Sequence, residues 1–254
     1  MRIFSFSSID STNRKALELA EQGADHGTAV VAESQSRGRG RLGRSWQSVP
    51  GKGLYCSIIL YPNLPLVDFP RLTFAAGLAV AEAIDRLYHL NTGLKWPNDI
   101  YFGRKKCGGI LTESANLQAS SPSRRSVVVG IGLNVNTAEN DFSEELRMRA
   151  TSLLLQSGRE IALDELFSCI HSGLLAEVDR FERQGFQQLM GRWRTRDILK
   201  GQRMRWLSTE GCCVEGISLG PDDSGLLHIV DDAGCRHEVL SGDVQLAASS
   251  GQEK

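Results

Sequence analysis

Arginine and glycine alternate in one segment of the chain, from Arg37 to Trp46, and this segment carries the clearest chemical signal. Four arginines fall within eight positions, so their guanidinium groups would repel one another unless anions lay among them. Guanidinium groups bind carboxylates and phosphates through paired hydrogen bonds, and glycines let backbone N–H groups approach such ligands closely. Trp46 adds an aromatic face on which a base could stack. We therefore interpret the segment as an anion-binding loop rather than as a solvated basic loop.

Gly38, Gly40 and Gly43 also match the glycine spacing of a dinucleotide-binding turn, but the surrounding sequence does not fit that fold. A helix should open directly after the glycines, yet residues 48–53 read Ser-Val-Pro-Gly-Lys-Gly. The acidic residue expected about 20 positions further on is also missing. The sequence therefore argues against nicotinamide or flavin chemistry.

Strands and helices alternate over the first 200 residues and would position this loop. Apolar residues at helical spacing predict a long amphipathic helix over 69–88, and the β-branched run 127–135 predicts a central strand. The other expected strands are 2–6, 28–33, 54–60, 94–102 and 107–114, and the other expected helices are 14–22, 162–183 and 186–199. This mixture predicts a sheet flanked by helices.

The pattern changes after residue 200, where short alternating segments are separated by turn residues. The expected strands are 204–207, 212–219, 225–230, 236–240 and 244–246. Such closely spaced strands are typical of a small β-barrel. We place a domain boundary there, with a ligand-binding domain at 1–200 and a barrel at 201–254.

The composition limits the possible partners and compartments. The 254 residues carry a formal net charge of −1, which argues against general binding to nucleic acid or membrane surfaces. The six cysteines and five histidines show no metal-ligand spacing. No apolar run approaches the roughly 20 residues that span a bilayer, and no signal-peptide core opens the chain. We expect a cytoplasmic protein.

Four short motifs occur in order: Ser11-Thr-Asn13, the arginine–glycine loop, Lys95-Trp-Pro-Asn-Asp99 and Lys105-Lys-Cys-Gly-Gly-Ile-Leu111. Each alone has a simple structural interpretation, such as a helix cap, an edge strand or a bend. Together with Gly130-Ile-Gly-Leu-Asn134 they resemble biotin protein ligases, which activate biotin with ATP and attach it to a carrier lysine. The resemblance covers nearly the whole chain. It implies an α+β fold with a class II synthetase-like core and an SH3-like C-terminal barrel.

The resemblance also implies roles for the motif residues. Biotin would be bound by Ser11, Thr12, Asn13, Gln35, Arg39, Gly40, Arg41, Lys106 and Gly109. ATP would be bound by Arg41, Arg44, Trp46, Lys95, Asn98, Asp99, Lys106 and Asn134. The catalytic residues would be Lys106, Arg39 and Arg41. Asp99 would bind Mg²⁺ or would instead accept a proton from the incoming lysine amine, and the residues leave both roles open.

The implied reaction explains why cations gather in these motifs. The carboxylate of biotin is ionised at neutral pH and needs no general base, but it must approach a second anion, the α-phosphate of ATP. Lys106 is our candidate for the decisive cation. Biotin and Mg-ATP would be substrates, with no tightly bound prosthetic group. The protein partner would be a biotin carboxyl carrier protein or domain of a biotin-dependent carboxylase, and neither DNA nor membrane would be a partner.

The chain departs from the family pattern at two places, and other functions compete with this one. Leu42 stands where the family often has an arginine, and only ten residues precede Ser11, so we expect no DNA-binding domain and no repressor activity. A lipoate or octanoate ligase would show an arginine pair followed by a glycine run, which is absent. The remaining alternatives are a non-catalytic sensor of biotin or nucleotide and a nucleic-acid module using 192–196, a segment interpreted as a solvated helix face.

Overall fold

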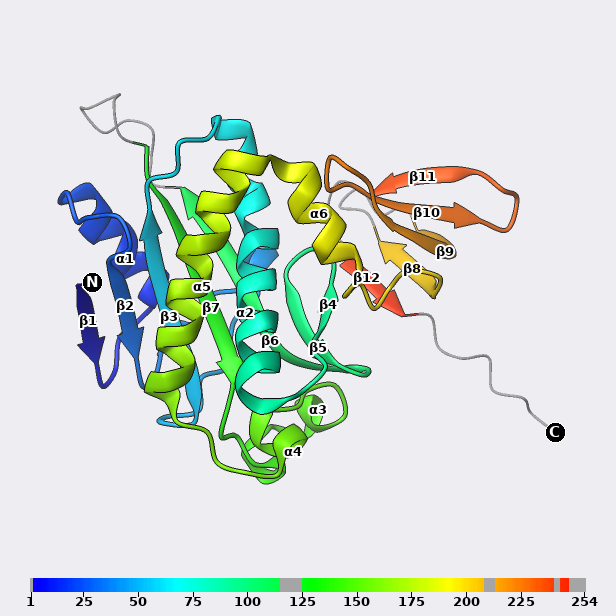
Figure 1. Ribbon diagram of the computed structural model, residues 1–254. Coiled ribbons are helices and arrows are strands. Elements are labelled where there is room, and N and C mark those ends of the chain that lie inside the picture. The colour runs from blue at the N-terminus through cyan, green and yellow to red at the C-terminus, as the bar shows by residue number, and fades with distance from the viewer. Residues whose placement is uncertain (1, 115–124, 208–212, 240–242, 247–254) are drawn as a thin grey trace.

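The computed structural model describes residues 2–114, 125–207, 213–239 and 243–246, which form two β-sheets and the helices around them (Figure 1). Cys212 and Leu240, at the ends of two expected strands, lie outside these ranges. The larger sheet has the order β1-β2-β3-β7-β6-β5-β4, with β1 parallel to β2 and all other neighbours antiparallel. Its strands are β1 (Ile3–Phe6), β2 (Ala29–Ala32), β3 (Gly53–Leu60), β4 (Gly93–Lys95), β5 (Asp99–Phe102), β6 (Lys105–Ser114) and β7 (Val127–Asn134).

The second sheet is antiparallel throughout, with the order β11-β10-β9-β8-β12. It comprises β8 (Arg203–Leu207), β9 (Cys213–Pro221), β10 (Leu227–Asp231), β11 (Arg236–Val239) and β12 (Asp243–Leu246). The helices are α1 (Thr12–Glu21), α2 (Leu72–Tyr88), α3 (Glu144–Arg147), α4 (Leu153–Ser157), α5 (Leu163–Gln184) and α6 (Phe186–Arg194), with 3₁₀ turns η1 (Arg41–Gly43), η2 (Leu66–Arg71) and η3 (Glu139–Asp141). The expected class, a mixed sheet with helices and a small second sheet, is confirmed. Among the helices that lie in the described ranges, none has the length and apolar character needed to cross a membrane.

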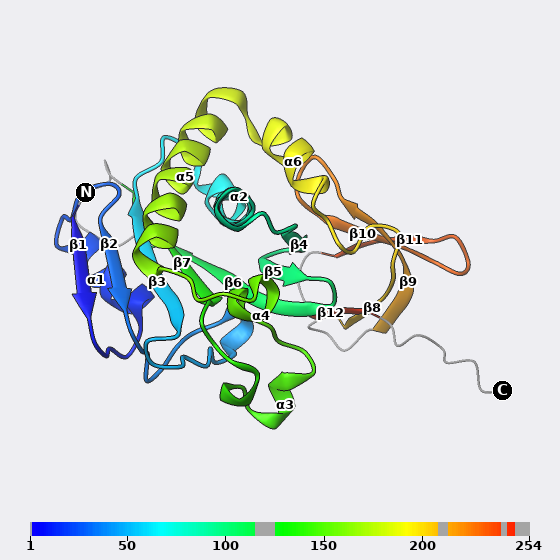
Figure 2. The ribbon, with the colours of Figure 1, turned by 60° about the horizontal axis from the view of Figure 1, so that its bottom comes forward.

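Helices cover both faces of the larger sheet because its apolar strands are buried on both sides. Successive side chains of a strand point to opposite faces. On β7, Val128 packs in a cluster with α1, whereas Val127 and Val129 pack in the main core with α2 and α5. Figures 1 and 2 show α2 and α5 side by side on that second face. The face that carries α1 is only partly covered and is left for the loops between strands.

Three expected elements are clearly wrong in their boundaries, and proline accounts for two of them. The helix expected over 186–199 ends at Arg194. The helix expected from residue 69 begins at Leu72, because Pro70 lies in the preceding 3₁₀ turn. The strand expected over 94–102 is two strands, β4 and β5, which pair antiparallel. Pro97 has no N–H to donate to a ladder, so the chain turns there instead of continuing as a strand.

The second sheet docks on this turn through a buried hydrogen bond. Trp96 Nε1 donates to the carbonyl oxygen of Gly225, at 2.9 Å, in the turn between β9 and β10. Gly225 has a φ of +88°, and a Cβ there would lie 3.1 Å from the ring of Phe186 and 3.3 Å from Phe74. Only glycine suits both the backbone conformation and this close approach. The main core includes Ile229 and other residues of the second sheet, so the two sheets share one hydrophobic cluster. The division into domains at residue 200 stays a prediction.

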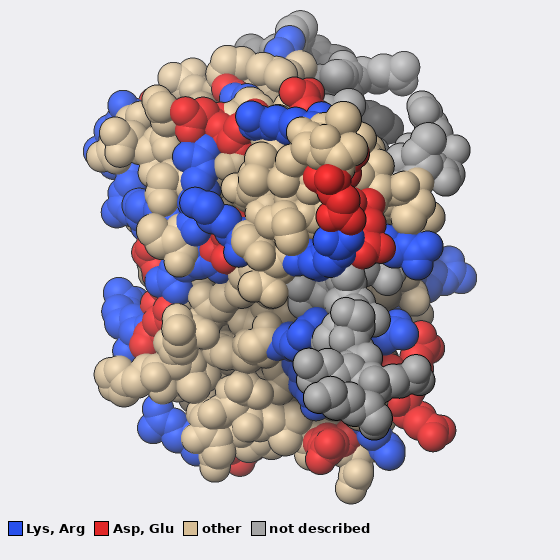
Figure 3. All heavy atoms as spheres, turned by 90° about the vertical axis from the view of Figure 1, so that its right-hand side faces the viewer, with Lys and Arg blue, Asp and Glu red and all other residues tan. Residues whose placement is uncertain are grey.

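The arginines of 192–196 do not form the solvated face expected from the sequence, and this interpretation is wrong. Arg192 pairs with Glu177 and Glu82, which links α6 to α5 and α2. Arg194 binds Asp223 and the carbonyl oxygen of Pro221 in the second sheet, and Arg196 pairs with Asp85. Basic and acidic side chains are interspersed on the face of the molecule that carries this sheet (Figure 3). The segment therefore joins elements together instead of presenting positive charge to nucleic acid.

Asp197 follows this segment and lies at the junction of α6, β4 and β9. Its Oδ1 accepts a hydrogen bond from the backbone N–H of Leu199, while Oδ2 is buried and has no partner among the described residues. A Cβ on Gly220 would come within 3.0 Å of Oδ2. Burial raises the pKa of Asp197 to about 6, and Lys200 opposes the shift. The folded protein thus keeps a proton here that the unfolded chain loses at lower pH.

Asp197→Asn should remove this pH dependence. Between pH 4 and pH 6 the folded state holds the extra proton, so the contribution of Asp197 to stability falls as the pH rises through this window. The free energy of unfolding of the variant, minus that of the wild type, should therefore be about 2 kcal/mol higher at pH 7 than at pH 4. Urea unfolding at both pH values measures the difference. Asp25→Asn, at an exposed carboxylate, is the matched control, and an equal gain there would contradict the assignment to Asp197.

Candidate functional site

Strand register aligns residues of several motifs in two neighbouring rows on the α1 face of the larger sheet. Residues directly opposite each other on paired strands point to the same face. Ser57, Gly130 and Leu111 form one row across β3, β7 and β6. The next row crosses five strands and consists of Tyr55, Gly132, Gly109, Asp99 and Lys95. The motifs that are far apart in the sequence therefore meet on one surface.

Glycines in these rows let other side chains lie directly on the sheet. A Cβ on Gly130 would stand 1.9 Å from Asn13 Oδ1, and a Cβ on Gly132 would stand 2.8 Å from the Trp46 ring. Gly109 is less crowded, with the position of its Cβ 3.4 Å from Lys106 Nζ. The glycines of β7 are thus required because side chains from α1 and from the arginine–glycine loop occupy the space above them.

The first turn of α1 contributes buried polar groups to the site. Ser11 occupies the N-cap position, but its side chain makes no capping hydrogen bond. The backbone N–H of Thr12 donates to Gln35 Oε1, at 2.9 Å, and the Thr12 hydroxyl lies 3.1 Å from the same oxygen. The hydroxyl of Ser57 lies 2.6 Å from Asn13 Oδ1 and 2.8 Å from Thr12 Oγ1. Thr12 and Asn13 therefore do more than start a helix, since they form part of a polar network on the sheet.

The arginine–glycine loop folds back on itself, and we call residues 38–46 the flap. The N–H of Trp46 donates to Gly38 O at 2.9 Å, and the N–H of Gly40 donates to Arg44 O at 2.7 Å. A Cβ on Gly38 would come within 2.5 Å of the Trp46 carbonyl oxygen, so this closure needs glycine. Leu42, at the tip, has a left-handed backbone with a φ of 55° and is 57% exposed. The flap is therefore a shaped loop with an exposed tip.

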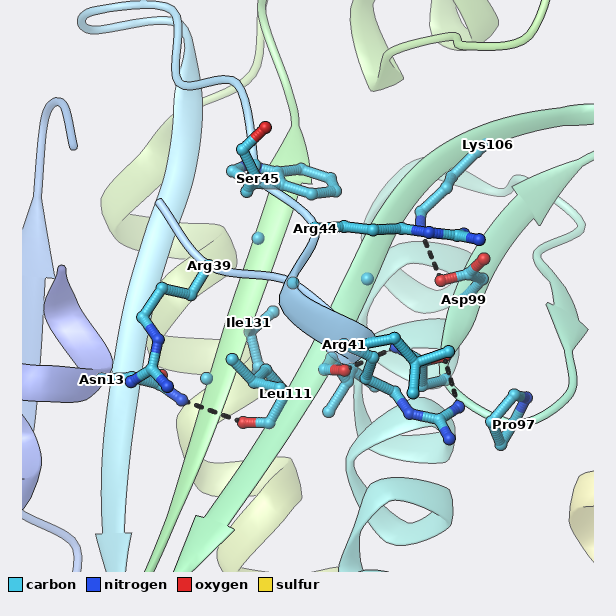
Figure 4. Close-up of a pocket in the computed structure, with 18 of the residues that line it drawn as sticks. Asn13, Arg39, Arg41, Arg44, Ser45, Pro97, Asp99, Lys106, Leu111 and Ile131 are labelled. Carbon is cyan, nitrogen blue, oxygen red and sulfur yellow. Dashed lines mark hydrogen bonds and ion pairs between the residues drawn. The ribbon is translucent and has the colours of Figure 1, made fainter. Parts of the chain in front are cut away.

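Each arginine of the flap extends over a different part of the sheet (Figure 4). Arg39 lies toward Asn13 and pairs with Glu113 at 2.7 Å. Arg41 lies toward Pro97 and donates to Asn98 Oδ1 at 3.3 Å, while Arg44 extends toward Asp99. Burial lowers the pKa of Arg41, an effect that Asp99 opposes and Arg44 adds to. An arginine stays charged even so, and the flap covers the site with positive charge.

Lys106 and Asp99 form an ion pair at the centre of the site. The Nζ–Oδ1 distance is 2.6 Å, and the two residues lie on the neighbouring strands β6 and β5. The same Nζ lies 5.7 Å from the centre of the Trp46 ring. Both side chains are only partly exposed, and the ion pair holds Lys106 in position. A ligand anion that replaced Asp99 would therefore meet a cation that is already in place.

Two adjoining cavities share this centre. The first has a volume of about 150 Å³, and the second of about 540 Å³. Both are bordered by Arg44, Ser45, Trp46, Lys95, Asp99 and Lys106. The other residues predicted from the sequence line the first cavity, namely Ser11, Thr12, Asn13, Gln35, Arg39, Gly40, Arg41, Asn98 and Gly109, except that Asn134 lines the second. The structure brings the predicted site residues together, and their individual roles stay predictions.

Several residues around the cavities were not predicted from the sequence. Glu113 and Ser57 lie on the site face of β6 and β3, where the alternation Gly109, Leu111, Glu113 would have indicated a shared face. The outer wall of the second cavity includes Phe142, Leu146, Arg149 and Ala150. Lys106 holds this wall in place, since its N–H donates to Arg149 O and its carbonyl oxygen accepts from Thr151 N. No sequence pattern indicated this contact.

Comparison with known proteins identifies relatives of the chain. It matches the biotin/lipoate A/B protein ligase family over residues 5–136. It is 39% identical over 241 residues to the bifunctional ligase/repressor BirA of Bacillus subtilis, covering 94% of this chain and 72% of that protein. It is 35% identical over 240 residues to the biotin–[acetyl-CoA-carboxylase] ligase of Mycobacterium tuberculosis, covering 92% and 85%.

A solved structure has the same fold. The biotin protein ligase from Aquifex aeolicus in complex with biotin and ATP superposes with a TM-score of 0.83, at 30% identity, over 98% of this chain and 99% of that chain. The resemblance seen in the four motifs is thereby confirmed. Because the family match spans about half of the chain and these relatives span most of it, the chain belongs to the biotin/lipoate A/B protein ligase family.

Proposed function

We propose that the protein is an ATP-dependent biotin protein ligase. The carboxylate of biotin attacks the α-phosphorus of ATP, which forms biotinyl-5′-AMP and releases pyrophosphate. The amine of a carrier lysine then attacks the acyl carbon, and AMP leaves. The observation that carries the proposal is the Lys106–Asp99 pair at the junction of two cavities beneath a flap of arginines. Relatives that are named biotin ligases support it.

The two cavities suit the two substrates. The first contains neutral hydrogen-bonding groups from Thr12, Asn13 and Gln35, which fit the ureido ring of biotin and have no counterpart in the dithiolane of lipoate. The second is larger and combines the apolar side chains of Phe142 and Leu146 with basic groups, a lining that fits an adenine ring and phosphates. Biotin in the first cavity and ATP in the second would place their reacting groups beside Lys106.

Lys106 would act by neutralising the two anions as they meet. Carboxylate and α-phosphate repel each other more strongly as water is excluded, so the barrier falls when fixed cations stand between them. Arg41 and Arg44 add charge from the flap, and Arg39 adds charge at the far end of the first cavity. In this step Lys106 exchanges its bond to Asp99 for bonds to the substrates.

Asp99 fits a role as the protein ligand for Mg²⁺. It is the only carboxylate among the described residues that line the two cavities, and Mg²⁺ in nucleotide sites is commonly held by one or two carboxylates together with phosphates. The bound metal would neutralise phosphate charge. The alternative role, accepting the proton of the lysine amine in the transfer step, uses the same oxygen atoms.

The remaining parts of the proposal concern partners and place of action. The acceptor is a biotin carboxyl carrier protein or domain, as the name of the relative from Mycobacterium tuberculosis suggests, and the reaction takes place in the cytoplasm. A lipoate or octanoate ligase is disfavoured by the polar first cavity. A non-catalytic sensor would have no need of the Lys106–Asp99 pair between the cavities, because binding alone requires no cation at the point where two anions meet.

Biotin-dependent exchange of labelled pyrophosphate into ATP tests the function directly. With Mg²⁺, the purified protein should catalyse exchange in the presence of biotin, and replacing biotin by lipoate should reduce the rate more than about a hundredfold. The dithiolane ring would leave buried polar groups of the first cavity without partners. Tight binding of biotin and ATP without any exchange would instead identify the protein as a sensor.

Lys106→Ala should lower the rate of adenylate formation by a factor on the order of 100 or more, because it removes a cation from the transition state. The Kd of ATP should change by less than about tenfold. Single-turnover kinetics and calorimetry measure the two quantities. Lys105→Ala removes the same charge from the adjoining residue, whose Nζ donates to Arg147 O, and should keep the wild-type rate. Equal losses of rate and ATP affinity in Lys106→Ala would contradict the bridging role.

Gly40→Ser should loosen the flap and let biotinyl-AMP escape into water. A Cβ at residue 40 would lie 3.3 Å from Arg44 O, which is the oxygen that accepts the hydrogen bond closing the loop. Rapid-quench sampling without carrier protein should find several times more free adenylate than with the wild type. Gly191→Ser in α6, where a Cβ meets no atom within 4 Å, is the matched control. If the two variants release adenylate at the same rate, the flap does not shield the intermediate.

A further inference from the structure

Glu113 contacts both structures that enclose the first cavity, the flap and the first turn of α1. Its Oε1 lies 2.7 Å from Arg39 Nη2, and its Oε2 accepts a hydrogen bond from Asn13 Nδ2 at 2.9 Å. Glu113 is itself absent from the cavity lining, whereas Arg39 and Asn13 both belong to it. The carboxylate therefore lies behind the wall and acts on it from there.

The hydrogen bonds of Asn13 determine which part of its amide can meet a ligand. One N–H of Nδ2 donates to Glu113, and the other donates to Leu111 O at 3.2 Å. An amide nitrogen has only two hydrogens, so both are used. The amide oxygen lies 2.6 Å from the Ser57 hydroxyl and has a second lone pair. Asn13 thus faces the cavity as a hydrogen-bond acceptor, in an orientation that a carboxylate at residue 113 enforces.

The same carboxylate determines where Arg39 lies. Figure 4 shows Arg39 extended toward Asn13, away from Arg44 and the Lys106–Asp99 pair. Asp99 is the only carboxylate among the described residues that line the first cavity, and it pairs with Lys106, so without Glu113 the flap arginines would repel Arg39 with no nearby carboxylate from that lining to offset them. Because Arg39 is 48% exposed and the pair is screened by water, we assign its effect to position rather than to stability.

We propose that Glu113 is a positioning residue for ligand recognition. It presents the Asn13 oxygen to the cavity, holds Arg39 at one end of the cavity, and so selects a ligand whose ring carries neutral N–H donors, as the ureido group of biotin does. This inference rests on the proposed function and deepens it. It assigns the choice of ring to a residue that touches neither the ring nor the reacting atoms.

Glu113→Gln tests the proposal with little change in shape. The new amide can satisfy only one of its two partners, because its N–H₂ group must face either Arg39 or the Asn13 N–H₂ group, and donors then oppose donors. Calorimetry on the full chain should find the Kd of biotin raised at least about tenfold, with the Kd of ATP within about twofold of the wild type. Glu21→Gln, an exposed residue at the end of α1, removes the same charge and should change neither value.

Biotinol, an uncharged analogue of biotin, distinguishes a positioning role of Glu113 from a purely electrostatic one. A purely electrostatic role predicts that losing the Glu113 carboxylate makes the site more positive and strengthens the binding of anionic biotin. A positioning role predicts that Glu113→Gln weakens biotin and biotinol, the alcohol without a carboxylate, by the same factor. Unchanged or tighter binding of biotin by a folded Glu113→Gln protein would overturn the proposal.

Failure of the proposed function and failure of the role of Glu113 give different results in these measurements. If the wild-type protein binds no biotin, the proposed function fails, whereas binding by the wild type that Glu113→Gln leaves unaltered refutes only the role of Glu113. If Glu113→Gln does not fold, Arg39→Gln is the variant to test in its place. It should lower the affinity for biotin less than Glu113→Gln would, because Asn13 keeps its hydrogen bond to Glu113, and it should leave the affinity for ATP unchanged. An equal loss of biotin and ATP affinity in Arg39→Gln would count against the proposal. In the double variant, the loss of biotin-binding free energy should be smaller than the sum of the losses in Glu113→Gln and Arg39→Gln, since the residues share one contact.

Discussion

The binding face depends on a steric constraint, namely that a side chain can lie flat on a β-sheet only where the strand beneath has no side chain of its own. Gly130 and Gly132 meet this condition on β7, where Asn13 and the Trp46 ring occupy the positions that their Cβ atoms would need. The rest of the site follows from this contact. With Trp46 on the sheet, the flap closes between Gly38 and Trp46, and its arginines extend over different parts of the sheet.

Carboxylates determine how the positive charge is distributed. Glu113 holds Arg39 at one end of the first cavity, and Asp99 holds Lys106 where the two cavities meet. Two of the cations, Arg39 and Lys106, therefore each have an anionic partner, on β6 and β5 respectively, and the repulsion expected from the dense run of arginines is reduced. A ligand can displace the Asp99 carboxylate from Lys106, because Asp99 lines the cavities. The Glu113 carboxylate lies behind the cavity wall and stays in place.

The sequence predicted the parts of the structure that depend on local patterns. The apolar run of β7 and the long helix α2 follow from periodicity. The motif residues were assigned to one site through the family resemblance, and the pairing register of β3, β7 and β6 brings them to one face. Glu113 was missed although the alternation along β6 places it on the face of Gly109 and Leu111, because its partners Arg39 and Asn13 lie far away in the sequence. The wall formed by 142–150 was missed because short helices without strong periodicity leave little signal. The charges of 192–196 were misread because their partners lie far away in the sequence.

The hydrogen bond between Trp96 and Gly225 bears on how the protein unfolds. Separating the second sheet would leave the indole N–H without its partner and would expose the rings of Phe74 and Phe186 to water. The change in sequence pattern near residue 200 therefore does not by itself indicate that the two sheets unfold separately. The two sheets are joined by a common interior, and chain cleavage between them would deprive the larger piece of part of its apolar lining rather than release an independent module.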